Sequence, residues 1–364
     1  NFNNPASYSF LNQTVFEIGM SSTFLILSQD NLEQKNQISG LLNLGLAFPI
    51  SKKIGIAIGL SPYSSVGYNI NSVTLNSSND VIGDVNYNYS GSGGLNKLVF
   101  GFGAQIIPDL SFGLNLNYFF GPINRVSDIE TQNSITQFQE QESFLINGIN
   151  IDLGLSYQYE INNKVMCLGT YIVPESQLNV DQSIFQYTYI TSGEYQSFID
   201  TILYNNNLTG KLLMPISYGL GASLSEPNNW LIGIDYNYTN WSNYSVYGQM
   251  FPYMHDKNQI IIGGSFIPNK TDIYNYWNRI EYKIGFTYST GYLDLTSLSN
   301  NNIDSSVLLE DVSISCGASL PMNKVTSRAN IGLRYGIRGS IQSAKTSDFI
   351  MEKYFMVRIL MFFL

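Results

Sequence analysis

Apolar residues alternate with small or polar residues along most of the chain, with the period of two that is typical of β-strands. The clearest case is residues 213–244, where two alternating runs flank a turn-forming segment around Pro227. One face of this expected hairpin is apolar, whereas the other carries Gly, Ser, Asn, Thr and Asp235. The pattern fits either a soluble sandwich with its apolar face inward or a membrane barrel with its apolar face toward lipid.

Further runs of this kind precede and follow the hairpin, and together they predict fourteen strands in seven hairpins. The expected strands cover approximately residues 14–27, 37–48, 54–61, 98–106, 110–120, 149–159, 165–173, 216–224, 230–239, 259–266, 280–288, 312–320, 329–337 and 350–363. The apolar face changes parity near Gly148, which predicts a β-bulge. Pro62 should mark a bulge, a kink or a break in pairing, because proline cannot donate to a ladder.

Six short turns marked by Pro or Asn alternate with long polar segments, which we predict to be loops. The longest of these segments are about 69–94, 122–142 and 174–208. An even number of strands with short turns at one end and long loops at the other is typical of bacterial outer-membrane barrels. Soluble propellers and sandwiches give no reason for every long loop to lie at one end. The sequence therefore favours an all-β, 14-stranded antiparallel transmembrane β-barrel.

Composition supports a membrane barrel and argues against several other classes of protein. Charged residues make up 12% of the 364 residues, about half the usual share for a soluble domain, and 14% are aromatic. No apolar run approaches the length of a membrane-spanning helix, so contact with the bilayer must be through strands. A net charge of −9 argues against nucleic acid as a partner, because phosphate binding needs clustered Lys and Arg. We expect the protein in the bacterial outer membrane, in contact with outer-membrane lipid.

Catalytic and metal-binding chemistry has little support in the sequence. The single histidine, His255, lies in an expected loop without a nucleophile motif nearby, and we interpret it as a solvated side chain rather than a base. There is no phosphate-binding glycine loop and no cluster of metal ligands, so we predict no enzyme activity, no cofactor and no metal. Cys167 and Cys316 fall on non-adjacent strands and should be free thiols. Trp230, Trp241 and Trp277 fit interfacial anchors better than ligand contacts.

Charged residues on the polar faces of the strands are expected to point into the lumen. They are Asp235, Arg279, Glu281, Lys283, Arg334, Arg338 and Arg358. In one interpretation the arginines bind a carboxylate head group through their planar guanidinium forks. In the other, which we favour, these charges satisfy one another and pair with Asp152 or Glu17.

Several segments resemble the FadL/TodX family of outer-membrane transporters, and in particular its relatives in Bacteroidetes. They are Asn4-Pro5-Ala6, FPISKKIGIAIGLSPYSSVG at 48–67, SGSGGLN at 90–96, and LMPISYGLGASL with WLIGIDYNYTNWSNY at 213–244. The resemblance implies that Asn4, Pro5 and Ala6 belong to an N-terminal hatch folded into the lumen. It also implies a kinked third strand that opens the wall laterally, onto which Pro62 maps.

The resemblance divides the chain into residues 1–13, a remnant of the hatch, and residues 14–364, the transmembrane barrel. Since about thirteen residues precede the first strand, we expect most of the hatch to be missing and the chain to be processed at both ends. Such a barrel implies passage of hydrophobic or amphipathic small molecules across the outer membrane. The alternative is an accessory or plug barrel docked on a larger outer-membrane complex, such as a type 9 secretion translocon, because fold alone does not decide function.

Overall fold

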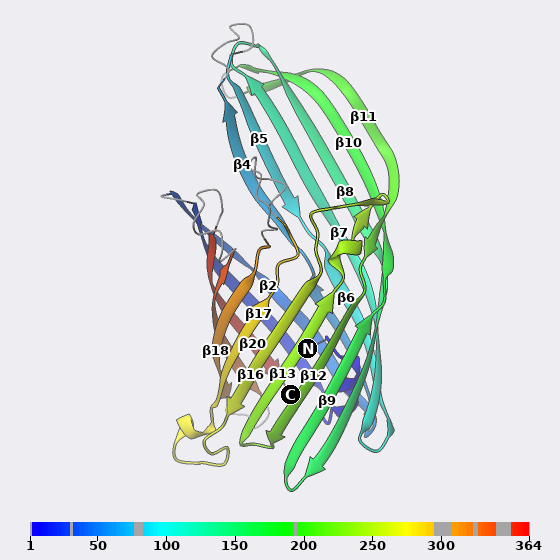
Figure 1. Ribbon diagram of the computed structural model, residues 1–364, viewed down its shortest axis with the longest axis vertical. Coiled ribbons are helices and arrows are strands. Elements are labelled where there is room, and N and C mark those ends of the chain that lie inside the picture. Colours follow the sequence, from blue (N-terminus) through cyan, green and yellow to red (C-terminus); the bar gives the residue numbers. More distant parts are fainter. Residues whose placement is uncertain are drawn as a thin grey trace.

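The computed structural model describes residues 2–29, 32–75, 83–192, 195–294, 308–322, 327–339 and 351–363. Fourteen of its strands form a closed antiparallel β-barrel (Figure 1). They are β1 (Val15–Gln29), β2 (Leu32–Ser51), β3 (Ile54–Pro62), β6 (Asn96–Ile107), β7 (Leu110–Thr131), β8 (Thr136–Ile161), β9 (Lys164–Val173), β12 (Ser217–Glu226), β13 (Trp230–Thr239), β16 (Lys257–Phe266), β17 (Glu281–Ser289), β18 (Asp311–Pro321), β19 (Arg328–Arg338) and β20 (Met351–Phe363). Pairing of β1 with β20, from Phe16 opposite Phe363 to Ser28 opposite Met351, closes the ring. The predicted barrel and its fourteen strands are confirmed.

The outer wall of the barrel is covered by large apolar side chains that no part of the described chain packs over. Ile284, Ile232 and Leu220, for example, are 68%, 61% and 56% exposed. Exposure of such a large apolar belt to water would cost free energy, whereas contact between the belt and lipid acyl chains does not. Closure also pairs the wall strands with one another along the ring, as a hydrocarbon environment demands of the backbone. The apolar face of the sequence pattern therefore faces lipid.

Short turns gather at one end of the barrel, at the bottom of Figure 1. The turn residues Asp109, Asn162, Asn163 and Asn228 have φ between 45° and 72°, the left-handed conformation that Asp and Asn tolerate better than other side chains. The predicted proline- and asparagine-rich turns are thus confirmed at these positions. One connection at this end is longer and contains a short 3₁₀ helix, η3 (Tyr276–Arg279).

At the opposite end, strands continue above the barrel as a curved sheet, which we call the upper sheet (Figure 1). It consists of β4 (Val66–Thr74), β5 (Val85–Gly93), the upper parts of β7 and β8, β10 (Ser176–Ser192) and β11 (Tyr195–Met214). The prediction that residues 69–94, 122–142 and 174–208 are polar loops was therefore wrong over most of their length. These segments are polar on the outer face, where amides pair across strands. Asn71 Nδ2, for instance, donates to Asn88 Oδ1 at 2.6 Å.

The expected bulge at Gly148 is also wrong, because β7 and β8 pair without a register shift. The apolar residues change parity there for another reason. Below Gly148 the large residues of β8, such as Ile149 and Ile151, face lipid. Above it, Ile146 is buried in an internal cluster and Leu145 points outward, 52% exposed. The strand stays regular while the apolar environment moves from outside the wall to inside it.

Two further 3₁₀ helices lie near the barrel axis and its upper opening. Helix η1 (Pro5–Phe10) packs in the lumen against β3, β6, β7 and β8. Helix η2 (Trp241–Asn243) begins the connection from β13 to β16, which also contains the short strands β14 (Ser245–Val246) and β15 (Gln249–Met250). No helix in the described part of the chain has the length and apolar character to cross a bilayer.

Candidate functional site

The N-terminal segment fills the lower lumen and is fixed by hydrogen bonds to the inner wall. Asn4 Oδ1 accepts from the backbone N–H of Ala6 at 3.0 Å, which caps η1 in the way Asn commonly does. Asn4 Nδ2 reaches the wall and donates to the carbonyl oxygens of Leu155 at 3.0 Å and Thr170 at 3.3 Å. Pro5 occupies the first turn of the helix, where its missing N–H costs little. Asn4-Pro5-Ala6 is thus a lumen element.

Glycines on the inner wall allow this close approach. A Cβ at Gly113 would overlap the backbone of Pro5, and one at Gly55 would overlap the carbonyl oxygen of Tyr8. The small residues that left the second face of the strands unable to form a dry core therefore make room for η1. Tyr8 OH donates to Asn115 Oδ1 at 3.1 Å and completes the contact.

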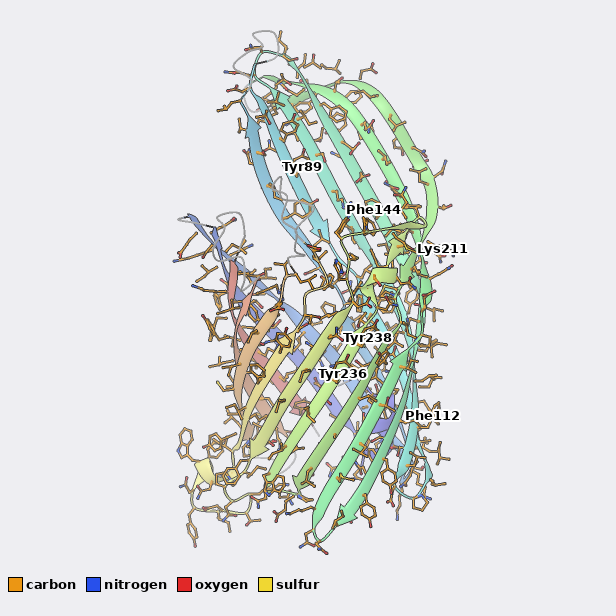
Figure 2. All side chains as sticks on the ribbon, in the orientation of Figure 1. Tyr89, Phe112, Phe144, Lys211, Tyr236 and Tyr238 are labelled. Atoms are coloured by element: carbon orange, nitrogen blue, oxygen red, sulfur yellow. The ribbon has the colours of Figure 1, made fainter. Side chains whose placement is uncertain are left out.

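Above the N-terminal segment, the barrel opens into a cavity of about 480 Å³, which we call the aromatic cavity. Its floor is an apolar cluster of Leu95, Ile146, Val180, Leu212 and Met214. Phe144 of β8 contributes to the wall and faces the inside of the upper sheet (Figure 2). The remaining wall is largely aromatic, and its members include Tyr63, Trp241, Tyr244, Phe251, Tyr253 and Tyr292.

The connection that begins with η2 closes one side of the aromatic cavity. Trp241 stacks on Tyr292 with ring centroids 5.2 Å apart, and Tyr244 lies 5.6 Å from Phe251. Asp256 anchors the segment, accepting from Tyr238 OH at 2.6 Å and from the Ser242 backbone N–H at 3.2 Å. Burial alone would raise the pKa of Asp256, but these hydrogen bonds outweigh it and lower the pKa below its ordinary value. The carboxylate is therefore charged at neutral pH and holds the segment in place.

The wall of the barrel is interrupted beside this cavity, at the end of β3. Pro62 is the last residue of β3 and lies opposite Asn96. The pairing of β2 with β3 ends at Leu44 opposite Leu60. Above that level, in the described ranges, β2 pairs only with β1, and β4 only with β5. The strand therefore breaks at the predicted proline, and it leaves two unpaired strand edges facing one gap.

The glycines of the SGSGGLN motif let β5 leave the wall at this break. Gly93 and Gly94 have φ of 115° and 149°, and a Cβ on either would overlap a neighbouring carbonyl oxygen. The backbone N–H groups of Tyr63 and Ser64 both donate to the carbonyl of Leu95, at 2.8 and 3.1 Å. These bonds hold Tyr63 at the boundary between the gap and the aromatic cavity, where its ring packs edge-on against Phe119 at 4.9 Å.

Four of the seven predicted lumen charges, Glu281, Lys283, Arg334 and Arg338, belong to two groups on another part of the inner wall. Asp311 contacts Arg334 at 3.4 Å and Arg338 at 3.3 Å, and both guanidinium groups lie over the ring of Tyr354. Arg338 also contacts Glu352 at 3.6 Å. In the second group, Glu281 contacts Lys283 at 3.5 Å and Arg328 at 3.2 Å. These charges are satisfied by ion pairs, but of the pairs between residues named from the sequence only Glu281 with Lys283 is present in the described structure. Sequence reasoning missed their partners Asp311, Arg328, Glu352 and Tyr354, because strand register alone brings them together.

Other predicted positions differ from expectation. Arg279 is not on an inward strand face but ends η3 in the turn, with its guanidinium 5.2 Å from the ring of Tyr276. Asp152 and Glu17 do not pair with the arginines in the described structure, since their hydrogen-bond partners are Asn115 and Asn43. The Nε of Arg358 contacts Met356 Sδ at 3.0 Å. Asp235 lies over Gly221 on the lumen side.

Trp241, expected at a membrane interface, lines the aromatic cavity instead, because the chain turns inward after β13. Trp230 and Trp277 lie at the turn end of the barrel, where an interfacial role stays a prediction. Cys167 and Cys316 are free thiols, as predicted. His255 is half exposed, with Nε2 3.3 Å from Asp294 Oδ2.

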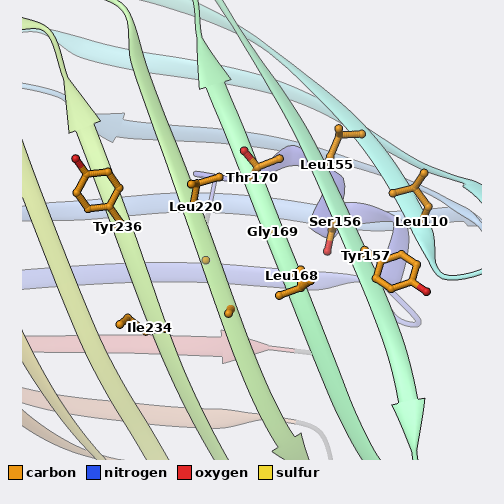
Figure 3. A pocket seen from close by; sticks show the side chains of 12 residues that line it. Leu110, Leu155, Ser156, Tyr157, Leu168, Gly169, Thr170, Leu220, Ile234 and Tyr236 are labelled. Carbon is orange, nitrogen blue, oxygen red and sulfur yellow. The ribbon is translucent and has the colours of Figure 1, made fainter.

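A second apolar hollow, of about 560 Å³, lies on the outer wall across β8, β9, β12 and β13 (Figure 3). Large side chains such as Leu155, Leu220 and Tyr236 surround it, and Thr170 and Ala222 leave the depression between them. These residues share the lipid-facing side of paired strands. Acyl chains reach this hollow directly, so it is part of the lipid-facing surface rather than the candidate site.

Few features of the sequence indicate the aromatic cavity as a whole. Its residues come from segments near 63, 95, 123, 144–146, 180, 212–214 and 241–254, and from Tyr292. The available signals were the parity change near Gly148 and the aromatic run after β13, and both were assigned to other causes. The cavity became visible only when the upper sheet brought these segments together.

Several solved structures with the same architecture are titled as transporters or channels, and the three described here have low sequence identity to the chain. The Pseudomonas putida toluene transporter TodX has 16% identity and a TM-score of 0.58, covering 99% of this chain and 91% of its own. The Ralstonia pickettii toluene transporter TbuX has 12% sequence identity and a TM-score of 0.58, and the match covers 99% of this chain and 91% of TbuX. A Pseudomonas aeruginosa FadL homologue has 10% sequence identity and a TM-score of 0.59, and the match covers 100% of this chain and 93% of the homologue. The TM-scores and the coverage show a shared FadL-type fold.

The fold and the lipid-facing belt identify the chain as an outer-membrane β-barrel, as predicted. The suggested origin in Bacteroidetes stays a prediction. No curated protein matches the chain. A protein-family model does, and it is described as BamG and matches residues 1–364. The match extends over the whole chain, which therefore belongs to the BamG family.

Proposed function

We propose that this barrel takes up hydrophobic or amphipathic small molecules at the cell-surface end and admits them toward the periplasm. The observation that carries this proposal is the aromatic cavity beside the break in the wall at Pro62. Ligand pockets are commonly concave, mostly apolar and about 300 to 1,000 Å³ in volume. The solved structures titled as toluene transporters and monoaromatic hydrocarbon channels, which share the fold, support the same class of ligand.

The inner face of the upper sheet carries aromatic and aliphatic side chains above the cavity, together with Arg125, Glu140 and Glu142. Tyr87 and Tyr89 of β5 share a face with Ile129 and Ile123 of β7, because directly paired residues of antiparallel strands point the same way. Ile123 lines the cavity, so this face is continuous with it. Figure 2 places Tyr89 on the upper sheet above Phe144. A hydrophobic molecule would meet this face before it reaches the cavity.

Release toward the periplasm requires the N-terminal segment to move. The hydrogen bonds of Asn4 and the fit of Pro5 against Gly113 hold this segment across the lower lumen. We assign it the role of a hatch on this basis. The gap beside Pro62 is a second route, which leads sideways into the outer leaflet and suits molecules that prefer lipid to water.

Trp241 offers a direct test of ligand binding. The chain has three tryptophans, and replacing Trp230 and Trp277 by Phe leaves Trp241 as the sole indole, inside the cavity. Bromobenzene, whose bromine quenches indole fluorescence on contact, should quench this variant saturably in detergent. Ile146→Ser, which removes apolar surface from the cavity floor, should weaken the apparent affinity about tenfold, since burying such a side chain is worth about 1.5–3 kcal/mol.

The matched control is Leu145→Ser, which changes the adjacent residue on the outer face of the same strand. It should leave the quenching curve unchanged. Non-saturable quenching, or equal effects of the two substitutions, would show that bromobenzene partitions into the detergent and would contradict the proposal.

A second candidate function, docking onto another surface protein, is favoured by apolar side chains on the outer rim of the upper sheet. Tyr204 and Phe198 of β11 are 64% and 58% exposed, and they contact Phe185 and Tyr187 of β10 with ring centroids 5.9 Å apart. The rim lies about 20 Å or more along the strand above the barrel opening, at roughly 3.3 Å per residue. It is therefore outside the hydrocarbon layer, where exposed apolar patches commonly mark interaction sites.

The surroundings of the rim define the chemistry of such a partner. Asp128, Glu130 and Asp181 lie on the same outer face, with Lys211 as a nearby cation. A partner with Lys and Arg around an apolar centre complements this face, whereas a second copy of the chain would bring acidic groups together. Three register shifts between β10 and β11 place extra residues in β11. These bulges interrupt the flat strand edge that a partner would need in order to add a β-strand to the sheet. Side chains rather than backbone would make the contact.

Purification from native membranes tests this candidate. In a mild detergent, wild-type protein should run as a larger complex that Phe198→Ser with Tyr204→Ser dissociates and Asn71→Ser leaves intact. Recovery of wild-type protein as a monomer would exclude docking without affecting the ligand-binding proposal.

A further inference from the structure

A small polar chamber of about 200 Å³ lies between the aromatic cavity and the N-terminal segment. Tyr63 and Met214 line both spaces, so the chamber and the cavity share a boundary. The lining of the chamber also includes Asn3 of the N-terminal segment and the inward side chains of β6, β7 and β8. A molecule in the aromatic cavity therefore lies beside polar surroundings inside the protein.

Two side-chain oxygens in this chamber have unused hydrogen-bonding capacity. Asn117 Oδ1 and Asn150 Oδ1 are buried, and no donor in the described chain reaches either atom. Their residues are 1% and 4% exposed and lie directly opposite each other on β7 and β8. Asn150 Nδ2 donates to Ser176 Oγ at 2.7 Å and faces the carbonyl of Pro174, which fixes its Oδ1 as the free atom. Buried acceptors rarely stay unpaired, so the pair indicates a donor that is supplied from outside the chain.

The charges in the chamber limit what that donor can be. Lys97 and Asp152 both line the chamber, one cationic and one anionic. An ammonium group entering the chamber would be attracted by Asp152 but repelled by Lys97, and a carboxylate would meet the reverse. A carboxylate would also face two amide oxygens that can only accept hydrogen bonds. An uncharged donor, such as a hydroxyl group, satisfies the amides without a net electrostatic cost.

We propose that the chamber binds the hydroxyl head group of an amphipathic ligand whose apolar part occupies the aromatic cavity. The inference rests on the proposed function, because it concerns the same ligand, and it names the ligand class as neutral alcohols or phenols rather than plain hydrocarbons or fatty acids. Asn117 and Asn150 accept from the head group. Asn115, which donates to Asp152 at 3.2 Å and to the Phe2 carbonyl at 2.8 Å, joins this part of the wall to the N-terminal segment.

Four probes with one apolar part and different heads test the proposal. Each carries a 4-bromophenyl group on a four-carbon chain that ends in methyl, hydroxyl, amine or carboxylate. Affinity is measured by quenching of the single-Trp241 protein and checked by calorimetry. The alcohol should bind about tenfold more tightly than the methyl compound, and more tightly than the amine and the carboxylate.

Asn117→Leu and Asn150→Leu should each remove the preference for the alcohol while leaving the affinity for the methyl compound within about twofold. The control is Asn147→Leu on the outer face of β8, which should keep the preference. Resistance of the folded barrel to unfolding in cold detergent, seen as a mobility shift on gels, confirms that each variant is folded.

Each other outcome of this experiment has a definite meaning. Equal binding of all four probes would show that water, rather than the ligand, donates hydrogen bonds to the two amide oxygens. This result would overturn the head-group assignment and leave the proposed function intact. Tightest binding of the amine or the carboxylate would overturn it as well. Absence of binding by every probe, including the methyl compound, would overturn the proposed function together with this inference.

Discussion

Asp256 illustrates how one residue controls the shape of the candidate site. Its carboxylate joins the end of β13 to η2 through Tyr238 and Ser242, and η2 carries Trp241 into the cavity wall. Hydrogen bonds to the charged form lower its pKa below the ordinary 3.8. A group with a depressed folded-state pKa stabilises the fold fully above its ordinary pKa and loses that contribution as the pH falls through the folded value.

We therefore predict an acid transition at this segment. Trp241 fluorescence should be constant from neutral pH to about pH 5 and should change below about pH 4, as the carboxylate is protonated. Asp256→Asn should show the altered fluorescence already at neutral pH. Asp272→Asn is the control, because Asp272 is also held by hydrogen bonds but lies in the turn at the opposite end. An unchanged signal in Asp256→Asn would contradict the anchoring role.

Inner-wall glycines show what could be understood about single residues from the sequence. The alternation placed Gly113 and Gly154 on the polar face correctly, but it gave no reason for glycine rather than serine. The reason is a contact between residues far apart in the chain, since a Cβ on Gly154 would overlap the side chain of Asn4. Alternation reports which face a residue occupies and says nothing of what lies against it.

At the scale of elements, β13 carries the strongest test of which face meets lipid. Ile234 is 50% exposed on the outer wall, and its neighbour Asp235 points to the lumen. Ile234→Arg should lower the free energy of folding into phospholipid bilayers by about 2–4 kcal/mol, because a charge near the membrane midplane is poorly solvated. Asp235→Leu should cost less than about 1 kcal/mol. Urea titration of folding into vesicles measures both values, and the reverse order would invert the two faces.

Strand assignment succeeded in the barrel and failed in the upper sheet for one reason. A wall strand faces lipid on one side, so its sequence must alternate clearly, and all fourteen were found. The strands of the upper sheet have water on the outer face, and their outer residues include Asn86 and Asn88 of β5 and Gln137, Gln139 and Gln141 of β8. Such sequences resemble loops by composition. Their strand structure depends on pairing with neighbours that a local pattern does not identify.

At the scale of the whole molecule, the N-terminal segment lies inside the lower lumen of the barrel. It packs against β3, β6, β7 and β8 across the lower lumen. We predict that deletion of residues 2–10 converts a closed barrel into one that conducts ions in planar lipid bilayers, because the glycine-lined inner wall then has nothing against it. The double variant Asn71→Ala with Asn88→Ala, which alters only the outer face of the upper sheet, should stay closed. A deletion protein as silent as the wild type would place the barrier elsewhere in the lumen.

The barrel, its strand number, its short turns and the break in strand pairing at Pro62 could be predicted from the sequence. These properties follow from alternation and turn chemistry, which act between residues close together in the chain. Only the tertiary structure decided the upper sheet, the aromatic cavity and the seat of the N-terminal segment. Each of these depends on contacts between distant segments, such as Asn4 with Leu155 or Trp241 with Tyr292. Strand register and closure of the ring set those contacts, and no local pattern encodes them.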